Sequence, residues 1–257
     1  MTVPFRVGAT SFVYPAGWAE NVARLAGRVR DVELLFFEAA ALPDEREIEE
    51  LAAWKARAGL TYSLHTPLAA SLASADEARR VEGVATVLRA VEVARPLSPE
   101  AVVVHVYLGD REGEAPPRDL AAFRRRAERS LEALAAAGLP RRAICVETLD
   151  YDFEILAPVV EALGLSVALD LGHQHRDGRP VQAVLERHLP RARVVQWHGV
   201  DPEGRDHRSL RHVPGDEARA VLATLRGACY EGALTLEVFR EDDFEESLAL
   251  LGRWLER

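Results

Sequence analysis

The sequence contains few cysteines and lacks a long apolar segment. Its 257 residues include only two cysteines, Cys145 and Cys229, so neither a disulfide framework nor a thiolate zinc site is indicated. Cys145 lies in the apolar run AICVE and is expected to be a small core residue. No apolar run approaches the ~18 residues of a membrane span. The N-terminal stretch MTVPFRVGATSF lacks the features of a signal peptide, so we expect a cytoplasmic protein without membrane partners.

The sequence also lacks an excess of basic residues. Its 32 Lys and Arg residues face 41 Asp and Glu residues, which gives a formal net charge of -9. Because an acidic surface repels a phosphate backbone, general binding to nucleic acid is disfavoured. Hydrophobic residues make up 48% of the chain, which is enough for a sizeable core. We therefore expect a globular monomer or homodimer that acts on a small molecule.

Short apolar runs recur along the whole chain. Eight of them are rich in Val, Leu, Ile and aromatic residues and mostly lack strict alternation, which is typical of strands covered on both faces. These runs comprise residues 5–10, 32–38, 60–66, 101–107, 143–148, 166–172, 193–199 and 233–239. Segments with apolar residues at three- and four-residue spacing lie between them and predict helices, for example at 44–59, 76–94, 118–138 and 241–257.

The alternation of strand and helix predicts the fold class. Parallel strands joined by right-handed helical crossovers are the natural arrangement for such a pattern. Eight units in about 250 residues fit an α/β (β/α)8 TIM barrel better than an open sheet. No linker or low-complexity tract divides the chain, so residues 1–257 are expected to form a single domain. The stretch REGEAPPRD, residues 111–119, is expected to be a longer loop.

Polar residues accumulate at the C-terminal ends of the predicted strands. In a (β/α)8 barrel these ends converge on one mouth, where catalytic groups are mounted. Burying a carboxylate or an imidazole is costly unless it is paired or bound to a metal. A ring of imidazoles and carboxylates without thiolates therefore predicts a divalent metal site. The candidate ligands are His65, His105, Glu147, Asp170, His173, His198, Asp206, His207 and Glu237.

Four other polar residues are considered, and three of them allow more than one interpretation. Glu38, near the end of the second predicted strand, is either an ion-pair partner or an acid that contacts the site. His175 is expected to be a loop residue, with contact to substrate as the alternative, and His212 stays undecided. His188 lies in the helix-like segment AVLERHLP and is expected to be a solvated surface residue.

The ordered set of strand-end residues resembles a known superfamily. His on the third and fourth strands, Glu on the fifth, Asp-x-x-His on the sixth, His on the seventh, an Asp/His pair beyond it and Glu on the eighth are similar to xylose-isomerase-like barrels, especially their apurinic-endonuclease-IV branch (apurinic endonuclease family 2). The resemblance implies three ions, held by His65, His105 and Glu147; by Glu147, Asp170, His198 and Glu237; and by His173, His207 and Asp206. That branch usually separates the last Asp and His by one residue, whereas they are adjacent here in GRDHRSL.

A narrower resemblance lies near the N-terminus. The element GATSFVYP, Gly8 to Pro15, and the strand DVELLFFE are similar to the opening of the cobamide-remodelling phosphodiesterases, which cut the nucleotide loop of vitamin B12-like cofactors. This resemblance implies a metal-dependent hydrolase. Several cations in one pocket suit phosphodiester cleavage, since they neutralise the phosphate and lower the pKa of a bound water. Zn²⁺ suits the donor set best, and Mn²⁺ is the alternative.

The resemblance also implies roles for single residues. Glu147 would bridge two ions and Glu237 would orient the attacking water, while His173 and His207 would hold the third ion on the leaving group. Aromatic residues near the predicted mouth would line a pocket for a large ring, namely Phe12, Tyr14, Tyr107, Trp197 and Phe239. The alternative for Trp197 is a core position between barrel and helices.

Two other functions stay open at this point. A sugar isomerase or epimerase of the same superfamily needs one metal, held by residues equivalent to Glu147, Asp170, His198 and Glu237. Such an enzyme does not need the other histidines as ligands. A non-catalytic, metal-dependent binding protein is the third hypothesis, although a site freed from catalysis would be expected to lose ligands. The additional histidines therefore favour hydrolysis.

Overall fold

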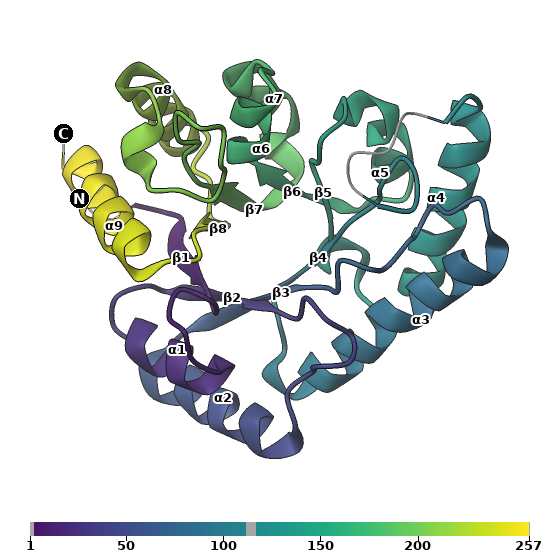
Figure 1. Ribbon diagram of the computed structural model, residues 1–257, viewed down its shortest axis with the longest axis horizontal. Coiled ribbons are helices and arrows are strands. Elements are labelled where there is room, and N and C mark those ends of the chain that lie inside the picture. The colour runs from purple at the N-terminus through teal and green to yellow at the C-terminus, as the bar shows by residue number, and fades with distance from the viewer. Residues whose placement is uncertain (1–2, 112–116, 257) are drawn as a thin grey trace.

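Eight parallel strands close into a barrel in the computed structural model, which describes residues 3–111 and 117–256 (Figure 1). Each strand pairs with the next along the chain, and the last pairs with the first. The strands are β1 (Arg6–Thr10), β2 (Asp31–Leu35), β3 (Thr61–His65), β4 (Ala101–Val104), β5 (Ile144–Glu147), β6 (Ser166–Asp170), β7 (Ala192–Trp197) and β8 (Ala233–Leu236). The predicted (β/α)8 TIM barrel is confirmed.

Helices follow the strands and surround the barrel (Figure 1). They are α1 (Trp18–Leu25), α2 (Glu45–Ala58), α3 (Glu77–Ala94), α4 (Leu120–Ala136), α5 (Ala157–Ala162), α6 (Leu171–Arg176), α7 (Val181–His188), α8 (Gly215–Gly227) and α9 (Glu241–Leu255). Short 3-10 turns occupy Arg95–Leu97, Arg141–Ala143, Phe153–Ile155, Leu189–Arg191 and Leu210–His212. The helices predicted at 44–59, 76–94, 118–138 and 241–257 correspond to α2, α3, α4 and α9. Of the loop predicted at 111–119, residues 112–116 lie outside the described residues.

Local sequence signals set the ends of several helices. The Asp44 carboxylate accepts a hydrogen bond from the Glu47 amide at the start of α2, and Asp76 and Asp119 cap α3 and α4 in the same way. Each acidic cap satisfies amide groups that have no partner within the helix and places negative charge at the positive end of the helix dipole. Gly59 follows α2 with φ 64°, a left-handed conformation that glycine adopts without strain.

Alternate strand residues point into the barrel, and its interior has an apolar part and a polar part. The side of β4 to β7 is apolar and small, with a separate buried cluster of Ala101, Val103, Cys145, Ala168 and Val194. The expected core position of Cys145 is thus confirmed, since the residue is 0% exposed. Further inward positions on β2, β3, β7 and β8 are polar, with Asp31, Glu33, Ser63, Gln196 and Thr235 all buried. Gln196 on β7 donates a hydrogen bond across the barrel to Glu33 on β2, with 3.0 Å between Nε2 and Oε1.

The described ranges include no helix that is both long and apolar enough to cross a membrane.

Asp31 lies at the N-terminal end of β2, which is the end away from the strand-end ligands. Its two oxygens accept hydrogen bonds from the hydroxyl groups of Thr61 and Ser63 at 2.5 and 2.9 Å. Burial raises the pKa of this carboxyl from 3.8 to about 6, although both hydrogen bonds act in the opposite direction. Asp31 therefore makes the folded state sensitive to pH.

We predict that Asp31→Asn removes this sensitivity. Because the folded pKa of about 6 exceeds the unfolded value of 3.8, the Asp31 contribution to stability is lost as pH rises through that window. The free energy of unfolding of the variant, relative to the unchanged protein, should rise by up to about 3 kcal/mol between pH 4 and pH 7. Urea unfolding of both proteins in chelator measures it, and a difference that does not vary with pH contradicts the prediction.

Candidate metal centre

The last inward-facing position of six strands carries an imidazole or a carboxylate. His65, Glu147 and Asp170 end β3, β5 and β6. One residue beyond β4, β7 and β8 lie His105, His198 and Glu237, each two positions after an inward-facing residue. The two-residue period of a strand therefore aims all six side chains at the mouth of the barrel. All six are buried, with His105 the most exposed at 8%.

The first group of possible ligands comprises His65, His105 and Glu147. His105 Nε2 lies 2.8 Å from Glu147 Oε2 and 3.2 Å from His65 Nε2. The outer nitrogen of each ring has its own partner: His65 Nδ1 lies 3.1 Å from the Thr66 carbonyl oxygen, and His105 Nδ1 lies 2.5 Å from the Tyr107 hydroxyl. These outer contacts fix both rings so that their Nε2 atoms face the same point, as is usual for metal-binding histidines.

The second group comprises Asp170, His198 and Glu237. His198 Nε2 lies 3.3 Å from Asp170 Oδ1. The His198 ring occupies the space above Gly172, where a Cβ would come within 2.2 Å of it. Asp170 also caps α6, because its Oδ1 accepts a hydrogen bond of 2.8 Å from the His173 amide. The sequence LDLGH thus combines the capping acid Asp170, a glycine that leaves room for the His198 ring, and His173 one helical turn after the acid.

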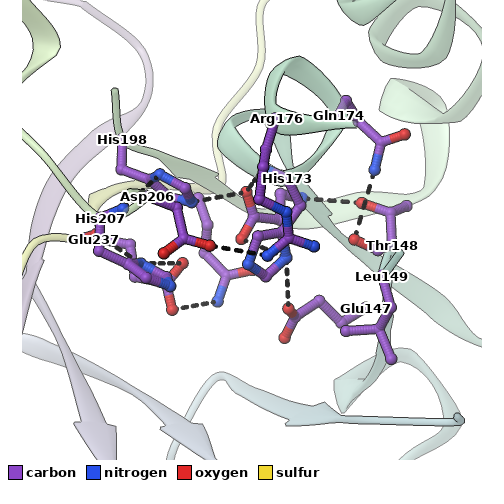
Figure 2. Close-up of polar contacts among 12 residues, drawn as sticks. Glu147, Thr148, Leu149, His173, Gln174, Arg176, His198, Asp206, His207 and Glu237 are labelled. Carbon is purple, nitrogen blue, oxygen red and sulfur yellow. Dashed lines mark hydrogen bonds and ion pairs between the residues drawn. The ribbon is translucent and has the colours of Figure 1, made fainter. Parts of the chain in front are cut away.

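The third group comprises His173, His198 and His207 and adjoins the other two. The ring centroids of His198 and His207 are 4.2 Å apart, and that of His173 is 5.6 Å from His207. His173 lies between His198 and Glu147 in Figure 2. Its Nδ1 is 3.1 Å from Asp170 Oδ2 and 3.8 Å from Glu147 Oε1. The groups therefore share members and form one continuous cluster, called the mouth cluster below.

Several buried polar atoms of the mouth cluster make no hydrogen bond among the described residues, although His173 Nδ1 lies at ion-pair distance from Asp170 Oδ2, and His198 Nε2 from Asp170 Oδ1. They are Asp170 Oδ2, His173 Nδ1, His198 Nε2 and Glu237 Oε2. Leaving such an atom unsatisfied costs about 1–3 kcal/mol, and more if it is charged. In each of the groups, one potential ligand atom per residue lies within 4.8 Å of the others. The donor set therefore fits divalent cations, without defining which metal binds.

The electrostatics of the mouth cluster also call for positive charge. Burial alone would raise the pKa of Glu147, but His105 and His65 outweigh it and hold that pKa well below the usual value. His173 and His198 do the same for Asp170 against the effect of burial. For Glu237, burial and the charges of neighbouring carboxylates, Asp170 first among them, raise the pKa well above the usual value.

The pKa values of His198 and His207 are shifted in opposite directions. Burial, with the neighbouring His198 as the next cause, lowers the pKa of His207 to about 4. Burial would also lower the pKa of His198, but Asp170 outweighs it and raises that pKa. His207 is therefore neutral at pH 7, which is the form of histidine that binds a metal ion.

Asp206 is the one predicted ligand that the structure places outside all of these groups. Its Oδ2 accepts a hydrogen bond of 2.7 Å from Arg176 Nη1, as Figure 2 shows, and its side chain is 29% exposed. Its neighbour His207 has φ 51° and turns inward, with Nδ1 3.0 Å from the Glu237 carbonyl oxygen. Because the two residues are adjacent in the chain, their side chains diverge, and only His207 joins the cluster.

Aromatic rings flank the mouth cluster on one side. The Phe239 ring lies 4.5 Å from the His207 ring, and Phe37 lies 5.5 Å from His65 and 6.0 Å from Phe239. Phe12 packs on Phe37 at 5.7 Å and is 43% exposed. We call Phe12, Phe37 and Phe239 the aromatic wall. A cavity of about 510 Å³ opens beside it, with Phe12, Phe239 and Arg240 among its lining residues.

Three of the aromatic residues expected to contact substrate point elsewhere. Trp197 is 1% exposed and packs on Trp254 of α9, because its neighbours Gln196 and His198 take the inward positions. The pocket role of Trp197 is therefore wrong, and the core alternative holds. Tyr14 is buried and its hydroxyl accepts a hydrogen bond from Arg28, although the residue is among those that line the cavity. Tyr107 is 4% exposed and contacts His105 from behind.

The remaining polar residues lie outside the mouth cluster. Glu38 is exposed on the loop after β2, because that strand ends at Leu35. The buried carboxylate of β2 that lies nearer the mouth is Glu33. His175 Nδ1 lies 3.2 Å from Glu217 of α8. His212 Nε2 accepts a hydrogen bond from Arg211 Nε. The surface position expected for His188 is wrong.

His188 ends α7 on the face turned toward the neighbouring segment. It is 6% exposed, its Nε2 lies 3.2 Å from Glu154, and its ring packs on Phe153 at 5.1 Å. Burial, as the largest cause, lowers its pKa. It is a packing residue remote from the mouth.

Four residues that border the mouth cluster or lie just below it were not predicted from the sequence: Glu33, Gln196, Phe37 and Arg176. Counting back two residues from His198 identifies Gln196 as an inward position, and counting forward two residues from Asp31 identifies Glu33. Phe37 carries no comparable signal, because it lies in an apolar run that continues past the end of β2. Arg176 is found only through its contact with Asp206.

The closed barrel and its mouth cluster define the class to which the chain is assigned. The family model of the xylose isomerase-like TIM barrel matches residues 22–256, and the chain belongs to this family. Among the solved structures, it resembles a D-tagatose 3-epimerase-like protein with a TM-score of 0.81 and 20% identity, over 98% of this chain and 97% of the other.

Two further solved structures show the same fold. Endonuclease IV from Thermus thermophilus superposes with a TM-score of 0.71 and 23% identity, over 98% of this chain and 99% of its own. An L-ribulose 3-epimerase superposes with a TM-score of 0.74 and 20% identity, over 98% and 95%. No curated protein matches the sequence. These relatives include both epimerases and an endonuclease, so the fold is compatible with either activity.

We predict that divalent cations stabilise the chelator-treated protein. Zn²⁺ or Mn²⁺ should satisfy the unpaired atoms of the mouth cluster, and a thousandfold excess over Kd should add about 4 kcal/mol of stability. Thermal unfolding with and without metal measures the gain. His198→Gln should lose most of it, whereas His188→Gln, which changes a buried histidine outside the cluster, should keep it. Equal gains in both variants would show that the metal binds elsewhere.

Proposed function

We propose that the chain is a metal-dependent phosphodiesterase that acts on a small-molecule phosphodiester. One observation carries this proposal: His65 and His105 form a complete second donor set around Glu147, beside the set of Asp170, His198 and Glu237. A sugar isomerase that works with one ion has no use for the second set. Two or more adjacent cations are the usual arrangement for displacement at phosphorus.

The proposed ligands follow the groups of the mouth cluster. One ion would bind His65, His105 and Glu147; a second would bind Glu147, Asp170, His198 and Glu237; and a third would bind His173 and His207, with Asp206 joining if it leaves Arg176. When bound, the ions would supply neutralisation of the phosphate charge and a lower pKa for a water molecule.

Residues of the chain would fix the spacing of the ions and position the water molecule and the leaving group. Glu147 lies between the first group and His173, so it would fix the spacing of the two sides. Glu237 is 3% exposed beside the second group, where its carboxylate would orient the attacking water. His173 and His207 face each other across the third group and would position the leaving oxygen. Arg176 also lies at this rim, where its guanidinium pairs with Asp206 and Asp177.

The aromatic wall supports a substrate with a broad apolar face. Phe12 is exposed beside the cluster, and aromatic residues supply large contact areas for flat or ring-shaped groups. The net charge of -9 disfavours a nucleic acid chain but not a molecule with a single phosphodiester. Together with the N-terminal resemblance, these features support the nucleotide loop of a cobamide as the substrate, in a cytoplasmic enzyme that remodels such cofactors.

A sugar epimerase is the second candidate function. It is favoured by the superposition on a D-tagatose 3-epimerase-like protein, which has the higher TM-score, 0.81 against 0.71 for endonuclease IV. In this case only Glu147, Asp170, His198 and Glu237 would hold a metal, and the carboxylates would also move protons.

Parallel assays distinguish the two functions. We predict that the metal-loaded protein, incubated anaerobically with an adenosylated cobamide, releases a cobinamide-type product that chromatography detects. The same preparation should leave ketoses such as tagatose unchanged. Interconversion of a ketose without any change to the cobamide would establish the epimerase instead.

We further predict that Glu147→Gln abolishes turnover without unfolding the barrel. The amide keeps the size of the side chain but loses the charge shared between the ligand groups, so activity should fall more than about 100-fold. Circular dichroism and thermal unfolding check the fold, and His188→Gln serves as the control with unchanged activity. Near-normal turnover by Glu147→Gln would exclude the bridging role.

A further inference from the structure

Three buried side chains lie just below the mouth cluster, and none of the three proposed ion positions uses them: Glu33, Gln196 and Thr235. Glu33 Oε2, Gln196 Oε1 and Thr235 Oγ1 lack hydrogen-bond partners among the described residues, as does Glu237 Oε2 next to them. The first three side chains are 0% exposed and Glu237 is 3% exposed. Such oxygen atoms are costly in a folded protein unless a water molecule or a ligand satisfies them.

The backbone places these side chains on strands that face one another across the barrel. Glu33 lies on β2, whereas Gln196 and Thr235 are register partners on β7 and β8. Gln196 Nε2 lies 3.0 Å from Glu33 Oε1 and 3.5 Å from Glu237 Oε1, so the amide donor is already engaged between the two carboxylates. Its carbonyl oxygen is left as a further acceptor.

Comparison with Asp31 shows that the barrel can satisfy a buried carboxylate on β2 by other means. Asp31 lies two residues before Glu33, and each of its oxygens accepts a hydroxyl hydrogen bond from β3. Glu33 receives one hydrogen bond, from Gln196, and its second oxygen has no partner among the described residues. One ligand atom each from Glu33, His65 and Glu237 lie within 4.8 Å of one another.

We propose that Glu33 and Glu237 form a further divalent cation position, with Gln196 Oε1 and Thr235 Oγ1 as additional oxygen donors. His65 stays with the ion beside His105 and Glu147, because its Nδ1 faces the Thr66 carbonyl oxygen and the single lone pair of its Nε2 serves one ion. The further position therefore offers oxygen atoms alone, whereas the His65, His105 and Glu147 group carries two imidazoles and one carboxylate. Oxygen-rich sites suit Mn²⁺ better than imidazole-rich sites do. The deep position therefore favours Mn²⁺ over Zn²⁺. It requires metal binding by the mouth cluster's residues but not phosphodiester cleavage.

Mn²⁺ titration of the chelator-treated protein tests the proposal without an activity assay. Electron paramagnetic resonance of free Mn²⁺ counts the equivalents bound to the full chain and gives their dissociation constants. Glu33→Gln keeps the side-chain volume and removes the charge. It should lose one Mn²⁺ equivalent or weaken one at least about tenfold, while Zn²⁺ binding changes less.

Asp31→Asn is the matched control, because it neutralises the neighbouring buried carboxylate of the same strand outside the ligand groups. It should bind Mn²⁺ like the unchanged protein. If Glu33→Gln does not fold, Glu33→Asp keeps the charge but withdraws the carboxylate by one methylene, and the same loss of Mn²⁺ is expected. Unchanged Mn²⁺ number and affinity in a folded Glu33 variant would overturn the proposal. So would an equal loss in Asp31→Asn, since the effect would then come from barrel stability.

Discussion

The crowding of buried carboxylates at the mouth of the barrel is the constraint on which the rest of the site depends. Glu147 and Asp170 are held as anions by the histidines around them, whereas the pKa of Glu237 is driven well above its usual value by burial and by its charged neighbours. Hydrogen bonds within the chain leave several of these atoms unsatisfied. Bound cations resolve both problems at once, because they neutralise the charge and occupy the unpaired lone pairs.

The barrel supplies the rigidity that such a site needs. Small apolar residues fill the interior on the side of β4 to β7 and support the ends of the strands that carry the ligands. Contacts behind the rings then orient single side chains: Tyr107 behind His105, the Thr66 carbonyl behind His65 and the open space over Gly172 for His198. The polar part of the interior, around Glu33 and Gln196, places further potential metal ligands below the rim of the barrel.

The fold and most of the mouth cluster could be predicted from the sequence, because both follow from strand periodicity. Eight apolar runs, seven of them with an imidazole or a carboxylate near the C-terminal end, leave little choice of architecture. The ligands His65, His105, Glu147, Asp170, His198 and Glu237 all lie where that pattern puts them. The incorrect predictions concern residues whose positions strand periodicity does not indicate. The run VELLFFE does not reveal that β2 ends at Leu35, so the exposed Glu38 was preferred to the buried Glu33.

Tertiary contacts decide the other residues. Nothing near Asp206 in the sequence indicates that Arg176 will engage it, and α9 determines that Trp197 packs outward on Trp254. His188 follows the composition of a surface helix, yet Phe153 and Glu154 cover it. Each of these outcomes depends on a segment far away in the chain or on the angle at which a helix packs. The aromatic wall shows the same dependence, since Phe12, Phe37 and Phe239 come from three separate loops.

The family and the fold accommodate both epimerases and an endonuclease, so the number of ions in the mouth is the property that separates the two chemistries. Elemental analysis of protein purified without chelators measures that number most directly. The account predicts at least two equivalents of divalent metal per chain. One equivalent, or none under every loading condition, would contradict it.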